Sequence, residues 1–106
     1  MAWFVLFVAG ILEVVWAYAM KLSDGFSRPW PTVVTFVAMF LSFGLLAYAM
    51  KSLPLGTSYT VWTGIGAVGA FVVGVVVLGE AVTALRVLAA VLIVGGLVLM
   101  KISTPA

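Results

Sequence analysis

The amino-acid sequence predicts an all-α membrane protein with four transmembrane helices. Of its 106 residues, 66% are hydrophobic and only 8% are charged, which is more apolar surface than a domain of this size can bury in water. The charged residues also lie almost entirely between four long apolar stretches. A lipid bilayer is the solvent that fits this pattern, and we expect residues 1–106 to form a single four-helix transmembrane domain.

The four apolar stretches run over residues 3–20, 31–50, 56–78 and 84–100. At about 1.5 Å per residue, each is long enough to cross or nearly cross a hydrocarbon core of roughly 30 Å. The chain starts with MAWF, and neither a basic segment nor a cleavage site flanks the first stretch, so we expect a helix there and not a signal peptide. Pro31 suits the start of the second helix. A cation follows the end of three helices, at Lys21, Lys51 and Lys101, where it complements the helix dipole.

The basic residues are divided almost evenly between the two sides of the membrane. Short connections place the N-terminus, the second connection and the C-terminus on one side, which carries Lys51 and Lys101. The other side carries Lys21, Arg28 and Arg86. Because orientation follows the imbalance of basic residues, this division favours insertion in both directions and an antiparallel, dual-topology homodimer with the architecture of inverted repeats. A weakly biased protein that inserts in one direction is the alternative.

Glu13 is the one charged residue between Trp3 and Met20. It lies about 15 Å beyond Trp3 along a helix, near the middle of the bilayer, where a charge costs about 3 kcal/mol. No Lys or Arg lies deep in any of the four stretches to neutralise it. We therefore expect a counterion that comes and goes, either a proton or a cationic substrate. A permanently neutral acid, hydrogen-bonded to a neighbour, is the alternative.

Aromatic and polar residues accompany Glu13. Trp16 lies one helical turn away, and an indole face beside a carboxylate suits a planar cation. Tyr59 and Trp62 share one stripe of the third stretch, and Ser42 lies near the middle of the second. Trp16 and Ser42 have simpler interpretations as well, which are packing or lipid contact for the tryptophan and a bond to its own helix for the serine.

Gly64 and Gly66 belong to a run of glycines in the third stretch. Glycines in membrane helices most often permit close packing, and they also allow a helix to bend. The fourth stretch holds no polar residue between Arg86 and Lys101. Its expected role is therefore contact with other helices.

The composition argues against several classes of protein. With no Cys and no His, we expect no disulfide, thiolate nucleophile, metal site or cofactor, and no nucleophile–base pair indicates an enzyme. Five basic residues are too few for a nucleic-acid surface. The residues alone leave open a proton-carrying ring subunit, a small dual-topology anion channel and a structural membrane subunit.

Three segments resemble the small multidrug resistance transporters: GILEVVWA at residues 10–17, KLSDGFSRPWP at 21–31 and LPLGTSYTVWTGIGAVGA at 53–70. The pairing of Glu13 with Trp16, together with the run WTGIGAVG, resembles the guanidinium-exporter branch. The resemblance covers the whole chain in length and helix order. It implies a multi-pass antiparallel homodimer in the bacterial inner membrane that exports guanidinium in exchange for protons by alternating access.

For the site, the resemblance implies that Glu13 of both subunits binds protons and substrate in competition. Four further residues would line the site, namely Trp16, Ser42, Tyr59 and Trp62. Gly64 and Gly66 would permit a bend that differs between the subunits. The implied partners are guanidinium or a related small cation, protons, a second copy of the chain and the bilayer. A broader exporter of quaternary ammonium ions and drugs is the alternative, although that branch usually has a small residue in place of Trp16.

Overall fold

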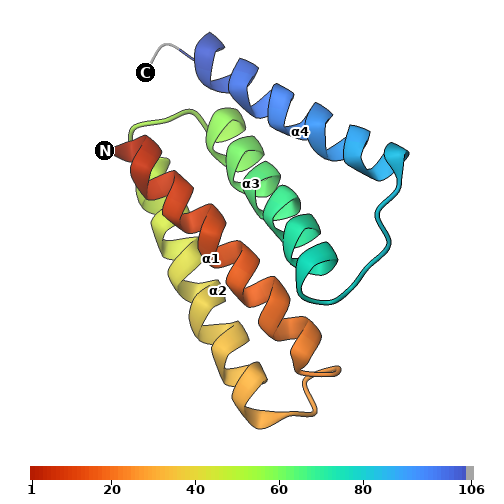
Figure 1. Ribbon diagram of the computed structural model, residues 1–106. Helices are drawn as coiled ribbons and strands as arrows, with labels where there is room; N and C mark the ends of the chain where they lie inside the picture. Colours follow the sequence, from red (N-terminus) through yellow and green to blue (C-terminus); the bar gives the residue numbers. More distant parts are fainter. Residues whose placement is uncertain (105–106) are drawn as a thin grey trace.

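The computed structural model describes residues 1–104, which fold into four α-helices (Figure 1). These are α1 (Ala2–Leu22), α2 (Pro29–Ala49), α3 (Leu55–Val76) and α4 (Ala84–Ser103). All four are long and apolar enough to cross a membrane. The predicted all-α membrane fold with four spans is therefore confirmed.

The ends of the helices follow local backbone chemistry. α2 begins at Pro29, two residues before the predicted start at Pro31, because a proline fits the first helical turn, where backbone N–H groups lack a helical partner in any case. α3 ends at Val76, two residues before the predicted end at Leu78. Gly79 follows with a φ of +71°, a left-handed conformation that glycine adopts without strain. The chain turns there toward α4.

α1 lies at the centre of the helix bundle. It packs along both α2 and α3, whereas α2 and α3 meet each other over a much smaller area. The backbone of α4 lies close to α3 alone and leans away from the other two helices (Figure 1). Helices α1, α2 and α3 thus form one packed group, called the three-helix unit below, to which α4 is attached along one side.

Small residues let the helices of the three-helix unit approach closely. A Cβ on Gly10 of α1 would lie 2.6 Å from Cγ2 of Ile65 on α3, and a Cβ on Gly69 of α3 would collide with Val14 of α1. Ala9 of α1 is fully buried. The packing of α1 against α3 therefore depends on side chains of minimal size, as is usual between membrane helices.

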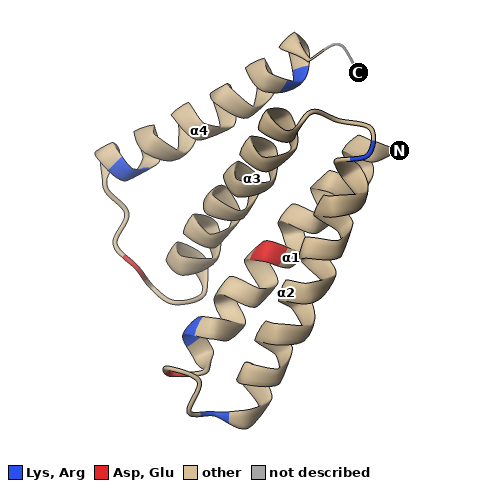
Figure 2. Ribbon diagram, turned by 180° about the vertical axis from the view of Figure 1, so that it is seen from behind, with Lys and Arg blue, Asp and Glu red and all other residues tan. Residues whose placement is uncertain are grey.

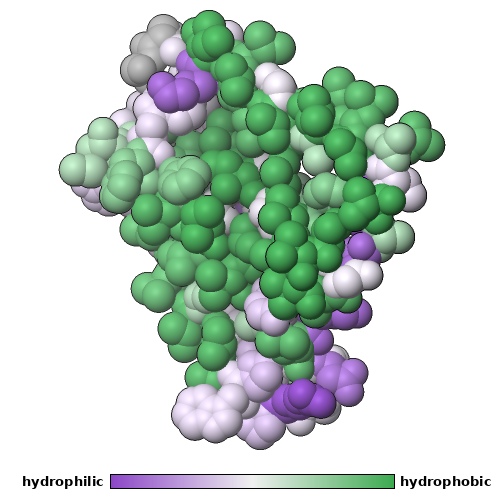
Figure 3. All heavy atoms as spheres, viewed as in Figure 1, coloured by the Kyte–Doolittle hydropathy of each residue, from purple (hydrophilic) through white to green (hydrophobic). Residues whose placement is uncertain are grey.

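On the face shown in Figure 3, apolar side chains cover most of the length of the molecule, while polar residues gather toward its ends. α4 has no buried residue at all. Lys and Arg lie at the ends of the helices, and the one acidic residue midway along a helix is Glu13 of α1 (Figure 2). The surface between the ends must therefore be covered by lipid or by another chain.

Candidate functional site

Glu13 lies midway along α1 with its carboxylate against α3. Gly66 makes this contact possible, since a Cβ at that position would collide with Oε1 of Glu13. Within residues 1–104 the only ion pair joins Arg86 to Glu80, 3.4 Å apart, and the buried Oε1 of Glu13 has no hydrogen-bond partner. The carboxylate thus has no counterion in the described part of the chain, and this oxygen accepts no hydrogen bond there.

Trp16 lies one helical turn beyond Glu13, and its indole N–H is also buried without a partner. Folded proteins leave few buried polar atoms unpaired, and each such atom needs an explanation. Four buried side-chain nitrogen or oxygen atoms in residues 1–104 have no hydrogen-bond partner, and two of them belong to Glu13 and Trp16. An unpaired acceptor and an unpaired donor thus lie one turn apart on α1.

Trp16 begins a row of aromatic rings that crosses α1, α2 and α3. Its ring centre lies 6.4 Å from that of Phe43, edge to face at 73°. Phe43 lies 5.8 Å from Trp62, and Trp62 lies 5.6 Å from Tyr59. These separations are typical of favourable aromatic pairs. The structure therefore brings Trp16, Trp62 and Tyr59 into one row, and it does so through Phe43.

Phe43 was not selected as a site residue from the sequence. It stands among apolar residues of α2 and is 43% exposed, like many lipid-facing side chains. Its place in the row depends on how α2 is rotated against α1 and α3. The hydrophobic periodicity of a single sequence does not predict that rotation. Its position directly after Ser42 is the one available hint.

Ser42 is fully buried and forms hydrogen bonds across helices. Its hydroxyl donates to the carbonyl oxygen of Ala9 at 2.6 Å and accepts from Nε1 of Trp62 at 2.9 Å. The simpler expectation for a serine in a helix, a bond to the carbonyl four residues earlier, is therefore wrong for Ser42 in this structure. Ser42 joins α1, α2 and α3 and fixes the orientation of the Trp62 indole.

Trp62 and Tyr59 differ in exposure. Trp62 is 7% exposed and Tyr59 is 54% exposed, so the aromatic row runs from the interior to the surface of α3. Tyr59 also lines a groove of about 460 Å³ between α3 and α4, together with Thr63, Gly64 and Gly96. The open end of the row therefore faces the space between these two helices.

Gly64 and Gly66, the two glycines expected to permit a bend, are points of close contact in this structure. α3 continues as one helix through both. Gly64 faces α4, where a Cβ would lie 2.5 Å from Cδ2 of Leu97, and Gly66 faces Glu13. A bend at these glycines stays a prediction.

The site offers a cation one carboxylate and several aromatic faces. Within residues 1–104, no three His, Cys, Asp or Glu side chains come together as a protein metal site requires. A carboxylate can hold a proton or an organic cation, and aromatic rings add attraction for the cation. The geometry therefore suits reversible binding of small positive species.

The chain is similar to known proteins over nearly its whole length. Residues 1–93 match the family described as Small Multidrug Resistance protein. The chain is 55% identical to the guanidinium exporter of Escherichia coli (strain K12) over 104 residues, which are 98% of this chain and 99% of that protein. It is 54% identical to the guanidinium exporter of Yersinia pseudotuberculosis (98% and 100% covered) and 50% identical to that of Salmonella typhimurium (97% and 98% covered). The chain therefore belongs to the small multidrug resistance family, and it is a multi-pass membrane transporter and not an enzyme.

Proposed function

We propose that this chain forms a proton-coupled antiporter that exports guanidinium and related small guanidinyl cations by alternating access. The observation that carries the proposal is the unpaired carboxylate oxygen of Glu13, one helical turn from Trp16 and midway along a membrane-spanning helix. The relatives described as guanidinium exporters support the choice of substrate.

Guanidinium matches the groups around Glu13. It is planar and permanently charged, and its fork of N–H donors pairs with both oxygens of a carboxylate. Its flat face can also stack on an aromatic ring such as that of Trp16. Binding would supply the carboxylate with the counterion that the described part of the chain does not provide.

Competition for one carboxylate supplies the coupling to protons. The chain has no His, and Glu13 is the only acid within the four helices. A protonated Glu13 has lost the charge that attracts guanidinium, so each site holds either a proton or the cation. Exchange then requires only that the transporter with an empty, charged site switches slowly between its two orientations. The free-energy cost of an uncompensated charge in the membrane favours such slow switching.

A second, inverted copy would complete the site. In the single chain, the aromatic row ends at the exposed Tyr59, and α4 buries none of its residues. An antiparallel homodimer would cover these surfaces, with α4 supplying much of the contact, and would place a second Glu13 across the interface. The two-against-three division of basic residues favours insertion in both directions. The bacterial inner membrane is the expected location.

The test is guanidinium exchange in liposomes. Purified protein reconstituted into liposomes with an acidic interior should take up guanidinium as protons leave. Glu13→Gln should abolish uptake, because an amide carries no charge and exchanges no proton at the site. Glu80→Gln is the matched control: it makes the same change at an exposed acid that pairs with Arg86, and it should keep the wild-type rate.

Transport by Glu13→Gln at the wild-type rate would contradict the proposal. Preferential uptake of a tetraalkylammonium ion over guanidinium by the wild type would instead identify the broader cation exporter.

A further inference from the structure

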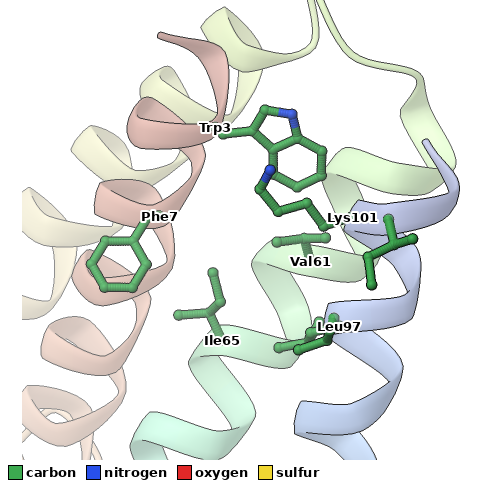
Figure 4. Close-up of a pocket in the computed structure, with 8 residues that line it drawn as sticks. Trp3, Phe7, Val61, Ile65, Leu97 and Lys101 are labelled. Carbon is green, nitrogen blue, oxygen red and sulfur yellow. The ribbon is translucent and has the colours of Figure 1, made fainter. Parts of the chain in front are cut away.

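An apolar groove lies between α1, α3 and α4, at the end of the molecule where α1 begins and α4 ends (Figure 4). Its volume is about 440 Å³. Val61 and Ile65 of α3 form its floor, with Phe7 of α1 and Leu97 of α4 on opposite sides. Neither Glu13 nor any ring of the aromatic row lines this groove, so it is separate from the proposed transport site.

One end of the groove carries a cation with no acidic partner. Nζ of Lys101 on α4 lies 4.9 Å from the ring centre of Trp3 on α1. The only ion pair within residues 1–104 is that of Arg86 with Glu80, so the Lys101 ammonium is not neutralised in that part of the chain. The buried indole N–H of Trp3 likewise lacks an acceptor there. Figure 4 shows both nitrogen atoms at the same end of the groove.

This charged end lies at the boundary between membrane and water. Trp3 is in the first turn of α1 and Lys101 is in the last turn of α4. Trp and Lys are both typical of that boundary, where the amphipathic ring and the charged head reach the lipid headgroups. The floor residues Val61 and Ile65 extend from it along α3. The groove therefore runs from the headgroup level into the hydrocarbon region.

We propose that the groove binds one acyl chain of an anionic phospholipid, whose phosphate pairs with Lys101. The apolar walls suit an acyl chain, and an unneutralised ammonium at the headgroup level selects a negative headgroup over a neutral one. A partner helix is about 10 Å across, so roughly one turn of it would occupy the whole volume, whereas an acyl chain is thin enough to lie along the groove. Such a lipid would wedge α4 against the three-helix unit.

Native mass spectrometry of the purified protein tests this proposal. The protein is titrated with phosphatidylglycerol and, separately, with phosphatidylcholine of the same acyl chains, and bound lipid is counted. The wild type should prefer phosphatidylglycerol. Lys101→Gln should lower the ratio of the two affinities about fivefold, the effect expected of one basic residue beside an anionic headgroup.

Two further variants locate the binding. Lys51→Gln is the matched control, because Lys51 is the other lysine near this end but lies over Tyr48 at 5.5 Å and does not line the groove. It should keep the wild-type ratio. Val98→Trp places a large side chain into the groove from a position on α4 that is 53% exposed, and it should reduce binding of both lipids.

Three outcomes would overturn the proposal. An equal loss in Lys51→Gln and Lys101→Gln would indicate general attraction of anionic lipid to this end of the molecule. Wild-type lipid binding by Val98→Trp would exclude the groove as the site. Loss of dimer in Val98→Trp with unchanged lipid binding would show that a second copy covers the groove. Each readout is independent of guanidinium transport.

Discussion

The three-helix unit and α4 differ in how they use polar and small residues. Within the three-helix unit these residues are shared between helices: the Ser42 hydroxyl bonds to α1 and α3, and Gly66 of α3 makes room for the Glu13 carboxylate. Every group that can bind a cation at the proposed site belongs to this unit. Its helices are held in one arrangement because their polar contacts cross from helix to helix.

α4 is held by fewer and more peripheral contacts. Leu97 packs on Gly64 of α3, and the hydroxyls of Thr57 and Thr104 form a hydrogen bond of 3.1 Å between α3 and the end of α4. Most of the other large apolar side chains of α4 are exposed. The difference teaches that, in the proposed transporter, the first three helices supply the binding chemistry and the fourth supplies the surface for assembly.

The largest expected effect tests whether binding depends on the Glu13 charge. As pH falls, protons occupy the carboxylate and guanidinium is excluded, so the Kd for guanidinium should rise by up to about tenfold per pH unit if each cation displaces one proton. Isothermal titration calorimetry at several pH values, in buffers of different ionisation enthalpy, measures both the Kd and the protons released. A Kd that does not change with pH would remove Glu13 from the binding reaction.

The two contact glycines of α3 test the comparison directly, because Gly66 faces the three-helix unit and Gly64 faces α4. Gly66→Ala would place a methyl group where Oε1 of Glu13 lies, which should displace the carboxylate and abolish most guanidinium binding. Gly64→Ala meets the far end of the Leu97 side chain, which can rotate aside, so binding should be largely kept. Dissociation constants of both variants, with dimer content as a control for folding, make the measurement.

The same pair separates a contact role from a hinge role. If both glycines serve as a bend in α3, either alanine should slow alternating access to a similar degree while leaving equilibrium binding intact. Equal transport defects with unchanged guanidinium affinity would therefore favour the hinge and contradict the contact interpretation.

Trp16→Gly should change selectivity more than affinity. Loss of the ring removes a cation–π contribution of about 0.5 to 2 kcal/mol for guanidinium, while the bidentate pairing with Glu13 survives. Larger apolar cations should gain relative to guanidinium because they can fill the enlarged space. The measurement is the ratio of dissociation constants for guanidinium and a tetraalkylammonium ion, with Trp30→Gly as the control, since Trp30 is 79% exposed at the start of α2. A ratio that stays at the wild-type value would return Trp16 to a packing role.

The sequence predicted best what depends on one helix at a time. Four long apolar runs with charged residues between them predicted the four helices, and the family expected from the motifs is confirmed over residues 1–93. Glu13 and Trp16 could be paired because they lie one turn apart in the same helix. The place of Phe43 in the aromatic row could not be predicted, because it depends on the rotation and depth of one helix against another. The hydrogen-bond partners of Ser42 could not be predicted for the same reason.

The groove at Lys101 could not be predicted from the sequence either, because it depends on how whole helices are placed against one another. An apolar fourth stretch predicts a helix, but the angle at which α4 leaves α3 is set by side-chain contacts such as Leu97 on Gly64. That angle creates the space between Phe7 and Leu97. No sequence pattern within the fourth stretch predicts this angle.

The smallest expected effect concerns stability and compares a hydroxyl that bonds within the three-helix unit with one that bonds to the end of α4. Ser42→Ala removes two interhelical hydrogen bonds and leaves the buried Trp62 N–H unpaired, whereas Thr57→Val removes one bond, and Thr104 still donates to the carbonyl of Met100 at 2.6 Å. Because interhelical hydrogen bonds in membranes contribute about 0.6 kcal/mol on average and at most about 1.7, Ser42→Ala should lower the free energy of unfolding by an amount near that maximum. Thr57→Val should lower it by no more than about 0.6 kcal/mol. Reversible unfolding in mixed micelles, followed by tryptophan fluorescence, measures the free energy of unfolding of both variants.

A larger loss for Thr57→Val than for Ser42→Ala would mean that α4 is anchored more firmly than the three-helix unit is held together. That result would contradict the difference drawn between the two regions.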